Sequence, residues 1–189
     1  MSAEVSGRAF LGIIKHVKET YGANALHELL PTLPPATQKV FGGRILHATW
    51  YPYEAYIGLL KALAQKYGNG SSDYCRELGA ASGTRDINTV FRIYLAIAST
   101  ERLIRSCTKV WSSYYRNAGT MEAMSWAPEE TLLRISDFPD MAPEHCRLME
   151  GWMITTMNVL GADVIDGHES MCMSTGGAAH EFKCRWKKR

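Results

Sequence analysis

The C-terminal part of the chain gathers residue types that bind metal ions. Glu169, Cys172 and His180 fall within twelve residues, on either side of a Gly176-Gly177 turn. Zinc is bound by Cys, His and carboxylate ligands arranged in a tetrahedron. A hairpin through these residues would supply three ligands, and Cys146 is the best candidate for the fourth. Four protein ligands leave no open position, so such a site would be structural rather than catalytic.

The spacing of the ligands sets a condition on the backbone. Glu169 and Cys172 are three residues apart, so their side chains would point to opposite faces of a regular strand. A bulge or a strand end between them is needed. In the alternative interpretation the hairpin packs without metal, with the two cysteines as small core residues and Glu169 and His180 exposed. Cys184 and His168 are substitute ligands if the register differs.

Hydrophobic periodicity predicts the elements that position these residues. Helical spacing covers residues 8–21, 23–30, 53–67, 72–82, 86–98, 99–115 and 143–160. Strands are predicted over 45–50, 119–126, 131–138, 163–174 and 178–186. Helices segregated from hairpins indicate an α+β fold with an antiparallel four- or five-stranded sheet and a helical layer on one face. The prolines at 31, 34 and 35 divide a helical extension, 1–40, from a main domain, 41–189.

Composition limits the classes of function. A net charge of +2 over 189 residues argues against dominant nucleic-acid binding. No run of eighteen apolar residues is present, so we expect no membrane span, and the N-terminal segment lacks the features of a secretory signal. The odd count of five cysteines favours the reducing cytoplasm. The sequence has no nucleophile elbow, phosphate-binding loop or dinucleotide fingerprint, so we expect no enzyme.

Aromatic and apolar side chains are abundant enough to line a cavity. Between the helices and the sheet, a ligand pocket would draw on six residues: Phe91, Tyr94, Trp111, Trp126, Trp152 and Met153. Small-molecule sites are mostly apolar with a few polar groups. The simpler interpretation is that aromatic residues at helical spacing fill the core.

Four segments carry a resemblance to known proteins. They are Glu77–Gly83, Asp86–Arg92, Glu101–Ile104 and Trp111–Tyr115, and they resemble a paralogous group of uncharacterised myxobacterial proteins. The region from Gly151 to Phe182 is similar to the 4-vinyl reductase-like domain. That domain is a distant structural relative of the haem–nitric-oxide sensors and of the TRAPP vesicle-tethering subunits. The resemblance covers about residues 40–186.

The resemblance implies specific roles for some residues. Relatives that activate transcription in response to aromatic compounds bind a structural zinc through a helical Cys and a Glu-x2-Cys-x7-Cys hairpin. The matching positions here are Cys146, Glu169, Cys172 and His180, with His in place of the last Cys. In the same relatives a tryptophan before the last helix lines the ligand pocket, and Trp126 stands in the similar place.

These observations support three hypotheses. The first is a non-enzymatic cytoplasmic module that binds a small apolar, aromatic or acyl ligand and contains a structural zinc. The second is a dimeric protein-interaction scaffold without a ligand, as the TRAPP resemblance suggests, and a homodimer is expected in either case. The third is an accessory protein of tetrapyrrole metabolism, by analogy with the reductase relatives. Haem is not expected, because no propionate-binding motif accompanies the helical residues His16, His27 and His145.

Overall fold

The structure is a computed structural model that describes residues 2–89 and 100–188, without the side chains of residues 88, 89, 126 and 188. The N-terminal half contains β1 (Glu4–Ser6), α1 (Gly7–Tyr21), α2 (Ala25–Leu29), η1 (Leu30–Thr32), α3 (Pro35–Phe41), β2 (Trp50–Pro52), α4 (Tyr53–Tyr67) and α5 (Tyr74–Thr89). The C-terminal half contains α7 (Thr100–Arg105), α8 (Cys107–Tyr114), β3 (Tyr115–Arg116), β4 (Thr120–Ala127), β5 (Glu130–Ser136), α9 (Pro143–Val159), β6 (Ala162–Met171), η2 (Met173–Thr175) and β7 (His180–Lys188).

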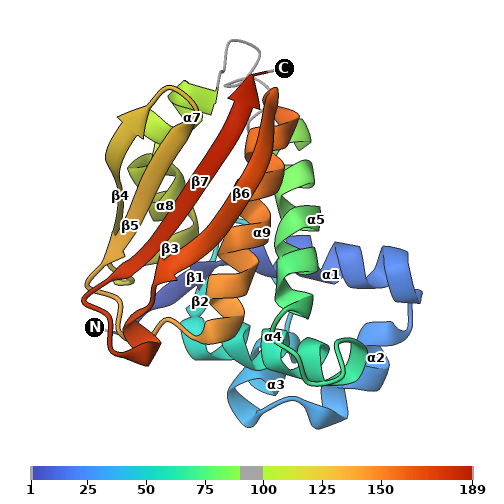
Figure 1. Cartoon of the computed structure of the whole chain (residues 1–189). Coiled ribbons are helices and arrows are strands. Elements are labelled where there is room, and N and C mark those ends of the chain that lie inside the picture. Colours follow the sequence, from blue (N-terminus) through green and yellow to red (C-terminus); the bar gives the residue numbers. More distant parts are fainter. Residues whose placement is uncertain (1, 90–99, 189) are drawn as a thin grey trace.

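The larger sheet confirms the predicted α+β fold with an antiparallel four-stranded sheet. Its strand order is β4-β5-β7-β6, and every neighbouring pair is antiparallel. One face of this sheet is covered by α9, with α5 on the far side of that helix (Figure 1). Along β5, buried residues alternate with partly exposed ones, which is the pattern of a sheet with one face on the core.

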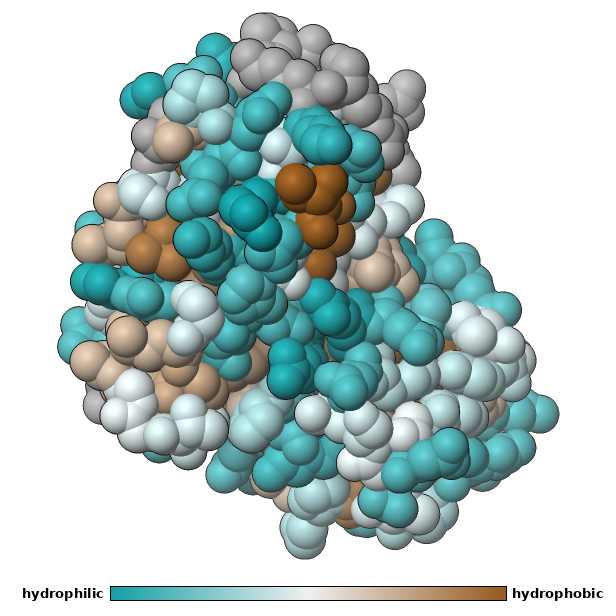
Figure 2. Space-filling view, viewed as in Figure 1, coloured by the Kyte–Doolittle hydropathy of each residue, from teal (hydrophilic) through white to brown (hydrophobic). Residues whose placement is uncertain are grey.

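The opposite face of the sheet meets solvent. In Figure 2 this face is mostly hydrophilic, with separate hydrophobic patches. The exposed hydrophobic residues include Met124 on β4 and Ile165 on β6, the two edge strands. No helix in the described residues is long and apolar enough to span a membrane.

Helices α5 and α9 approach each other closely because glycines line their contact. A Cβ on Gly79 would overlap the carbonyl oxygen of Leu148, and a Cβ on Gly151 would overlap that of Arg76. Gly83 lies one turn further along α5, against the carbonyl oxygen of Trp152. This contact places the residues of α9 that carry the candidate site at a defined distance from the helical layer.

A second sheet, which the sequence pattern did not indicate, joins distant parts of the chain. Its order is β2-β1-β3, so the strand at residues 4–6 is central and pairs with both others. The predicted strand at 45–50 is wrong in position, because pairing with β1 selects Trp50–Pro52 instead. The division into an extension of 1–40 and a domain of 41–189 stays a prediction; in the structure Val5, Phe10 and Ile13 belong to the common core.

The helical predictions differ from the structure at two breaks. Residues 74–89 form one helix, α5, across the break expected between 82 and 86, because Gly83 packs against α9 and does not end the helix. The helix expected over 99–115 is instead two, α7 and α8, with Ser106 between them. The part of the 86–98 prediction beyond residue 89 lies outside the described residues.

Candidate metal centre

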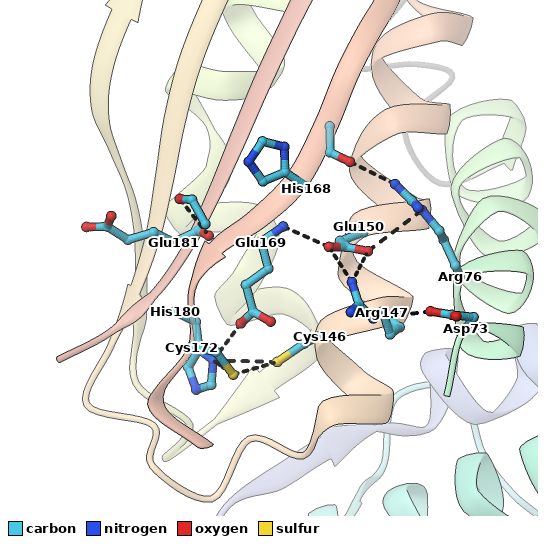
Figure 3. A network of polar contacts seen from close by, with 12 residues as sticks. Asp73, Arg76, Cys146, Arg147, Glu150, His168, Glu169, Cys172, His180 and Glu181 are labelled. Carbon is cyan, nitrogen blue, oxygen red and sulfur yellow. Dashed lines mark hydrogen bonds and ion pairs between the residues drawn. The ribbon is translucent and has the colours of Figure 1, made fainter. Parts of the chain in front are cut away.

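The four predicted ligands come together in the structure. The Sγ atoms of Cys146 and Cys172, a carboxylate oxygen of Glu169 and a ring nitrogen of His180 lie within 4.8 Å of one another. Cys146 belongs to the first turns of α9, Glu169 to β6, and His180 to the start of β7, while Cys172 follows the end of β6. Figure 3 shows the four side chains converging between the helix and the hairpin. The substitute ligands His168 and Cys184 are not part of this group.

The backbone has the irregularity that the three-residue spacing of Glu169 and Cys172 requires. The register of β6 against β7 shifts between Glu169 and Met171, and the strand ends at Met171. Cys172 then follows in an extended conformation, with φ −137° and ψ 129°. The irregularity and the strand end together turn Glu169 and Cys172 toward the same point.

The distances are those of a ligand shell. Nδ1 of His180 lies 3.5 Å from Sγ of Cys146 and 3.6 Å from Sγ of Cys172. The two sulfur atoms are 3.9 Å apart. Tetrahedral bonds of about 2.0–2.3 Å to zinc place neighbouring ligand atoms at separations of this size. The donor set of two thiols, one imidazole and one carboxylate is chemically suited to zinc.

A carbonyl group determines which nitrogen of His180 faces the cluster. Nε2 of His180 lies 3.2 Å from the carbonyl oxygen of Phe138, which can only accept a hydrogen bond. Nε2 therefore carries a proton, and in the neutral ring Nδ1 is a bare acceptor. Nδ1 is 3.0 Å from Oε1 of Glu169, another acceptor when ionised. Two acceptors at this distance need a proton or a cation between them, and zinc ligands are commonly oriented through their second ring nitrogen in this way.

In the absence of an ion, the negative charge of the cluster lies on Glu169. Burial raises the pKa of Cys146, and the Glu169 carboxylate raises it further. Burial also opposes ionisation of Glu169, but hydrogen bonds from His180, Cys146 and Cys172 outweigh it and lower the pKa of Glu169. His180 and Cys146 are buried, while Cys172 is partly exposed, so an ion can reach the site from the Cys172 side.

A salt-bridge network beside the cluster holds β6 to the helices. The buried carboxylate of Glu150 accepts hydrogen bonds from Arg147 at 2.9 and 3.0 Å and from the backbone N–H of Glu169 at 2.7 Å. Arg76 on α5 lies 3.7 Å from the same carboxylate and donates to the carbonyl oxygen of Gly167. Figure 3 shows that this network continues directly from the four ligands. Glu150 positions β6 beside the ligands, and the sequence prediction missed it, because a carboxylate next to an apolar helix stripe was its only signal.

Two small hollows lie between the helices and the sheet. The first has a volume of about 40 Å³ and includes Trp111 and Trp152 in its wall, with Arg8, Asp86 and Tyr114 as polar groups. The second, of about 20 Å³, is lined by Trp152 and Met153 among others. Three of the six predicted pocket residues thus line a hollow. Phe91 and Tyr94 lie outside the described residues, and the side chain of Trp126 is not described.

The polar groups of the first hollow are incompletely paired. Nε1 of Trp152 donates to Oδ2 of Asp86 at 2.8 Å, which joins α9 to α5. Nε of Arg8 is buried and makes no hydrogen bond within the described residues. Burial raises the pKa of Asp86 and also that of Tyr114. Such groups can receive a polar atom of a guest molecule.

The histidines of the chain do not suit haem in the interior. His145 is fully buried, but its Nδ1 and Nε2 each lie 2.8 Å from a hydroxyl, of Tyr53 and Tyr115 respectively. His180 is engaged at both nitrogens, and none of the six histidines, all within the described residues, lines either interior hollow. Sites for drug-sized ligands measure roughly 300–1,000 Å³, far more than these hollows offer, so the described residues do not fit a porphyrin there.

Comparison with known proteins first defines a class of fold. The chain has the fold of H-NOX domains, which agrees with the distant resemblance to haem–nitric-oxide sensors. No protein-family model matches the sequence, and no curated protein matches it either. The resemblances to the myxobacterial group and to the 4-vinyl reductase-like domain stay predictions.

Particular structures then give the extent of the likeness. An H-NOX protein from Shewanella oneidensis, in the Fe(II)NO ligation state, is 14% identical with a TM-score of 0.76 over 97% of this chain and 99% of that one. The unliganded Fe(II) H-NOX protein from K. algicida is 11% identical with a TM-score of 0.73, covering 97% of each chain. An oxygen-binding H-NOX domain related to soluble guanylate cyclases is 12% identical with a TM-score of 0.69, covering 97% of this chain and 95% of that one.

Proposed function

We propose that this chain is a non-enzymatic cytoplasmic sensor module in which a structural zinc ion holds α9 to the β6–β7 hairpin. The observation that supports the zinc is the convergence of Nδ1 of His180, oriented by the Phe138 carbonyl, with the Glu169 carboxylate and two thiols. Four protein ligands complete a tetrahedron and leave no position for a substrate. The ion would offset the negative charge of the cluster and join α9, the end of β6 and the start of β7.

The sensor part of the proposal rests on the hollow at Trp152. A volume of about 40 Å³ limits the guest to a small molecule, and the mostly apolar lining favours an apolar one. Val110, Met121 and Trp152 line both hollows, and methionine side chains adapt easily. A guest that moves Trp152 would disturb its bond to Asp86, and with it the contact between α5 and α9. Binding of the guest would thereby alter the position of α9, the helix that carries the zinc ligand Cys146.

Xenon is a suitable probe of the hollow, since apolar cavities in proteins bind it. We expect xenon to shift the tryptophan fluorescence and raise the melting temperature. Ser82 lines the first hollow, so Ser82→Leu should fill it and abolish both effects. Ser112→Leu, at an exposed position on α8 outside the hollow, is the matched control. Equal responses in both variants would refute the interior site. Native mass spectrometry of the purified protein would show a copurified guest.

The interaction scaffold remains a second candidate, because β6 is an edge strand of the larger sheet. Ile165 on this strand is 56% exposed, and exposed edge strands readily pair with another chain. Light scattering on Ile165→Lys tests for a homodimer through β6, and an unchanged mass would argue against this interface.

Tetrapyrrole chemistry finds less support. The H-NOX structures that the chain resembles contain Fe(II), but the interior hollows of the described residues suit neither the size of a porphyrin nor its need for an axial ligand. We therefore keep the prediction that no haem is bound in the interior. Titration with haemin, followed by its absorption bands, tests this prediction.

A further inference from the structure

A groove on the outside of the N-terminal helices shares no lining residue with the interior hollows. It has a volume of about 720 Å³ and lies between α1, α2, the end of α3 and the loop that follows. Ile14, Leu26, Leu30, Phe41 and Ile45 contribute its apolar floor. A smaller surface pocket of about 290 Å³, the side pocket, adjoins it, because Leu30 and Phe41 line both. The apolar surface is therefore long enough for an extended molecule.

The polar groups around this groove are all basic or neutral. Lys18, Arg44, His27 and His47 line it, and no acidic residue does. The sequence has no Asp or Glu between Glu28 and Glu54, and Glu28 itself is paired with Lys66 at 3.0 Å. Neither Lys18 nor Arg44 forms an ion pair with any residue in 2–89 or 100–188. The groove thus has cations without protein counter-charges beside an apolar floor.

The loop that carries Arg44 and His47 is held in place by its backbone. The N–H of Leu46 donates to the hydroxyl of Tyr51 at 2.8 Å, and the N–H of Gly7 donates to the carbonyl oxygen of Thr49 at 2.8 Å. A Cβ on Gly7 would overlap the carbonyl oxygen of Leu46, so the close approach depends on glycine. These contacts keep the side chain of Leu46 50% exposed at the groove. A preformed site loses less entropy on binding.

We propose that this groove binds a single-chain amphipathic carboxylate such as a fatty acid. The carboxylate would be held by Arg44, whose planar guanidinium pairs with carboxylates through two hydrogen bonds, with Lys18 adding charge. The alkyl chain would lie over Phe41 and Leu30 toward the adjoining side pocket of about 290 Å³. The length of the apolar surface and the unpaired cations together favour this class over a compact anion, which would leave the floor uncovered, and over a neutral lipid, which would leave the cations unpaired.

Binding of oleate below its micellar concentration tests the proposal by calorimetry on the full chain. We expect saturable one-to-one binding that weakens about ten-fold or more in Arg44→Gln/Lys18→Gln, because charge-assisted hydrogen bonds are lost. Lys15→Gln, on α1 but outside the groove, is the matched control. Oleyl alcohol should bind the unmodified chain more weakly than oleate does. The two compounds should bind the double variant with equal affinity. Melting curves confirm that the variants fold.

Several outcomes would overturn this inference. Absence of saturable oleate binding would do so, as would equal affinities of oleate and oleyl alcohol for the unmodified chain. If the unmodified protein does not bind oleate and the Leu46→Asp variant changes it from an oligomer to a monomer, the groove is an interface between copies of the chain instead. Displacement of bound oleate by a lower concentration of haemin would assign the groove to a different ligand. Xenon binding in the interior and zinc content are measured independently of oleate binding. A negative oleate result therefore does not contradict the proposed function.

Discussion

At the scale of single residues, His180 decides whether the cluster is a metal site. Its Nε2 is committed to the Phe138 carbonyl, so only Nδ1 is available to a ligand. The sequence predicted the four residue types and the need for an irregular strand. It could not predict Phe138, because that contact is made by a backbone carbonyl 42 residues away. A backbone acceptor leaves no mark on the residue type.

Metal binding at this site should depend on pH through the thiols. Because burial and Glu169 raise the pKa of Cys146, zinc must displace a tightly held proton. We therefore expect zinc affinity to rise with pH across the range from about 6 to 8, as protons are released on binding. Competition with a chromogenic chelator at several pH values measures this. An affinity that is independent of pH would mean that the thiols are not ligands.

His145 makes a separate prediction about acid stability. Burial, followed by the nearby His180, lowers the pKa of His145 to about 3. The unfolded chain then binds more protons than the folded one between about pH 6.5 and the folded pKa, so stability falls as the pH drops through this window. The loss should approach about 1.4 kcal/mol per pH unit.

The comparison is between the unmodified chain and His145→Gln, both in chelator so that metal does not contribute. Glutamine retains a donor and an acceptor for the hydroxyls of Tyr53 and Tyr115. The variant should be less stable at neutral pH but lose less stability on acidification. Parallel urea-unfolding curves against pH for the two proteins would contradict the prediction.

At the scale of elements, the contact between α5 and α9 positions Cys146 and Trp152. Gly151→Ala should destabilise the fold by about 1–3 kcal/mol, since its Cβ would overlap the Arg76 carbonyl and push the helices apart. Gly43→Ala is the control, because a Cβ there meets no atom within 4 Å. Chemical denaturation measures both. An unaffected Gly151→Ala protein would mean that the helices separate freely, and the proposed coupling from Trp152 to the zinc helix would lose its basis.

The elements show where sequence reasoning succeeds. The strands of the larger sheet and α4 have clear periodicity and defined ends, and they were predicted within a few residues. The small sheet was missed because β1 and β3 are three and two residues long, too short for an alternating pattern. The break expected at Ser82-Gly83 was wrong because a helix partner requires a small residue there. In both failures the structure depends on contacts between distant parts of the chain, which the local sequence pattern does not show.

At the scale of the whole molecule, the zinc ion is expected to stabilise one region more than the others. Chelation should raise hydrogen exchange in β6, β7 and the first turns of α9, which supply the ligands. Exchange in α4 and in the N-terminal part of α1 should change little, because no ligand lies there. Exchange that rises uniformly would instead indicate that metal governs global unfolding.

The most direct test of the zinc-locked hairpin is elemental analysis of the protein after expression with zinc and purification without chelator. One zinc per chain is expected in the unmodified protein, and none in Cys172→Ser/His180→Ala. The double variant should also melt at a clearly lower temperature, because structural zinc contributes directly to folding free energy. Ser174→Ala, which removes only the hydroxyl 2.9 Å from the Cys172 sulfur, should retain the metal. An unmodified protein without zinc, with a melting temperature equal to that of the double variant, would contradict this function for the cluster.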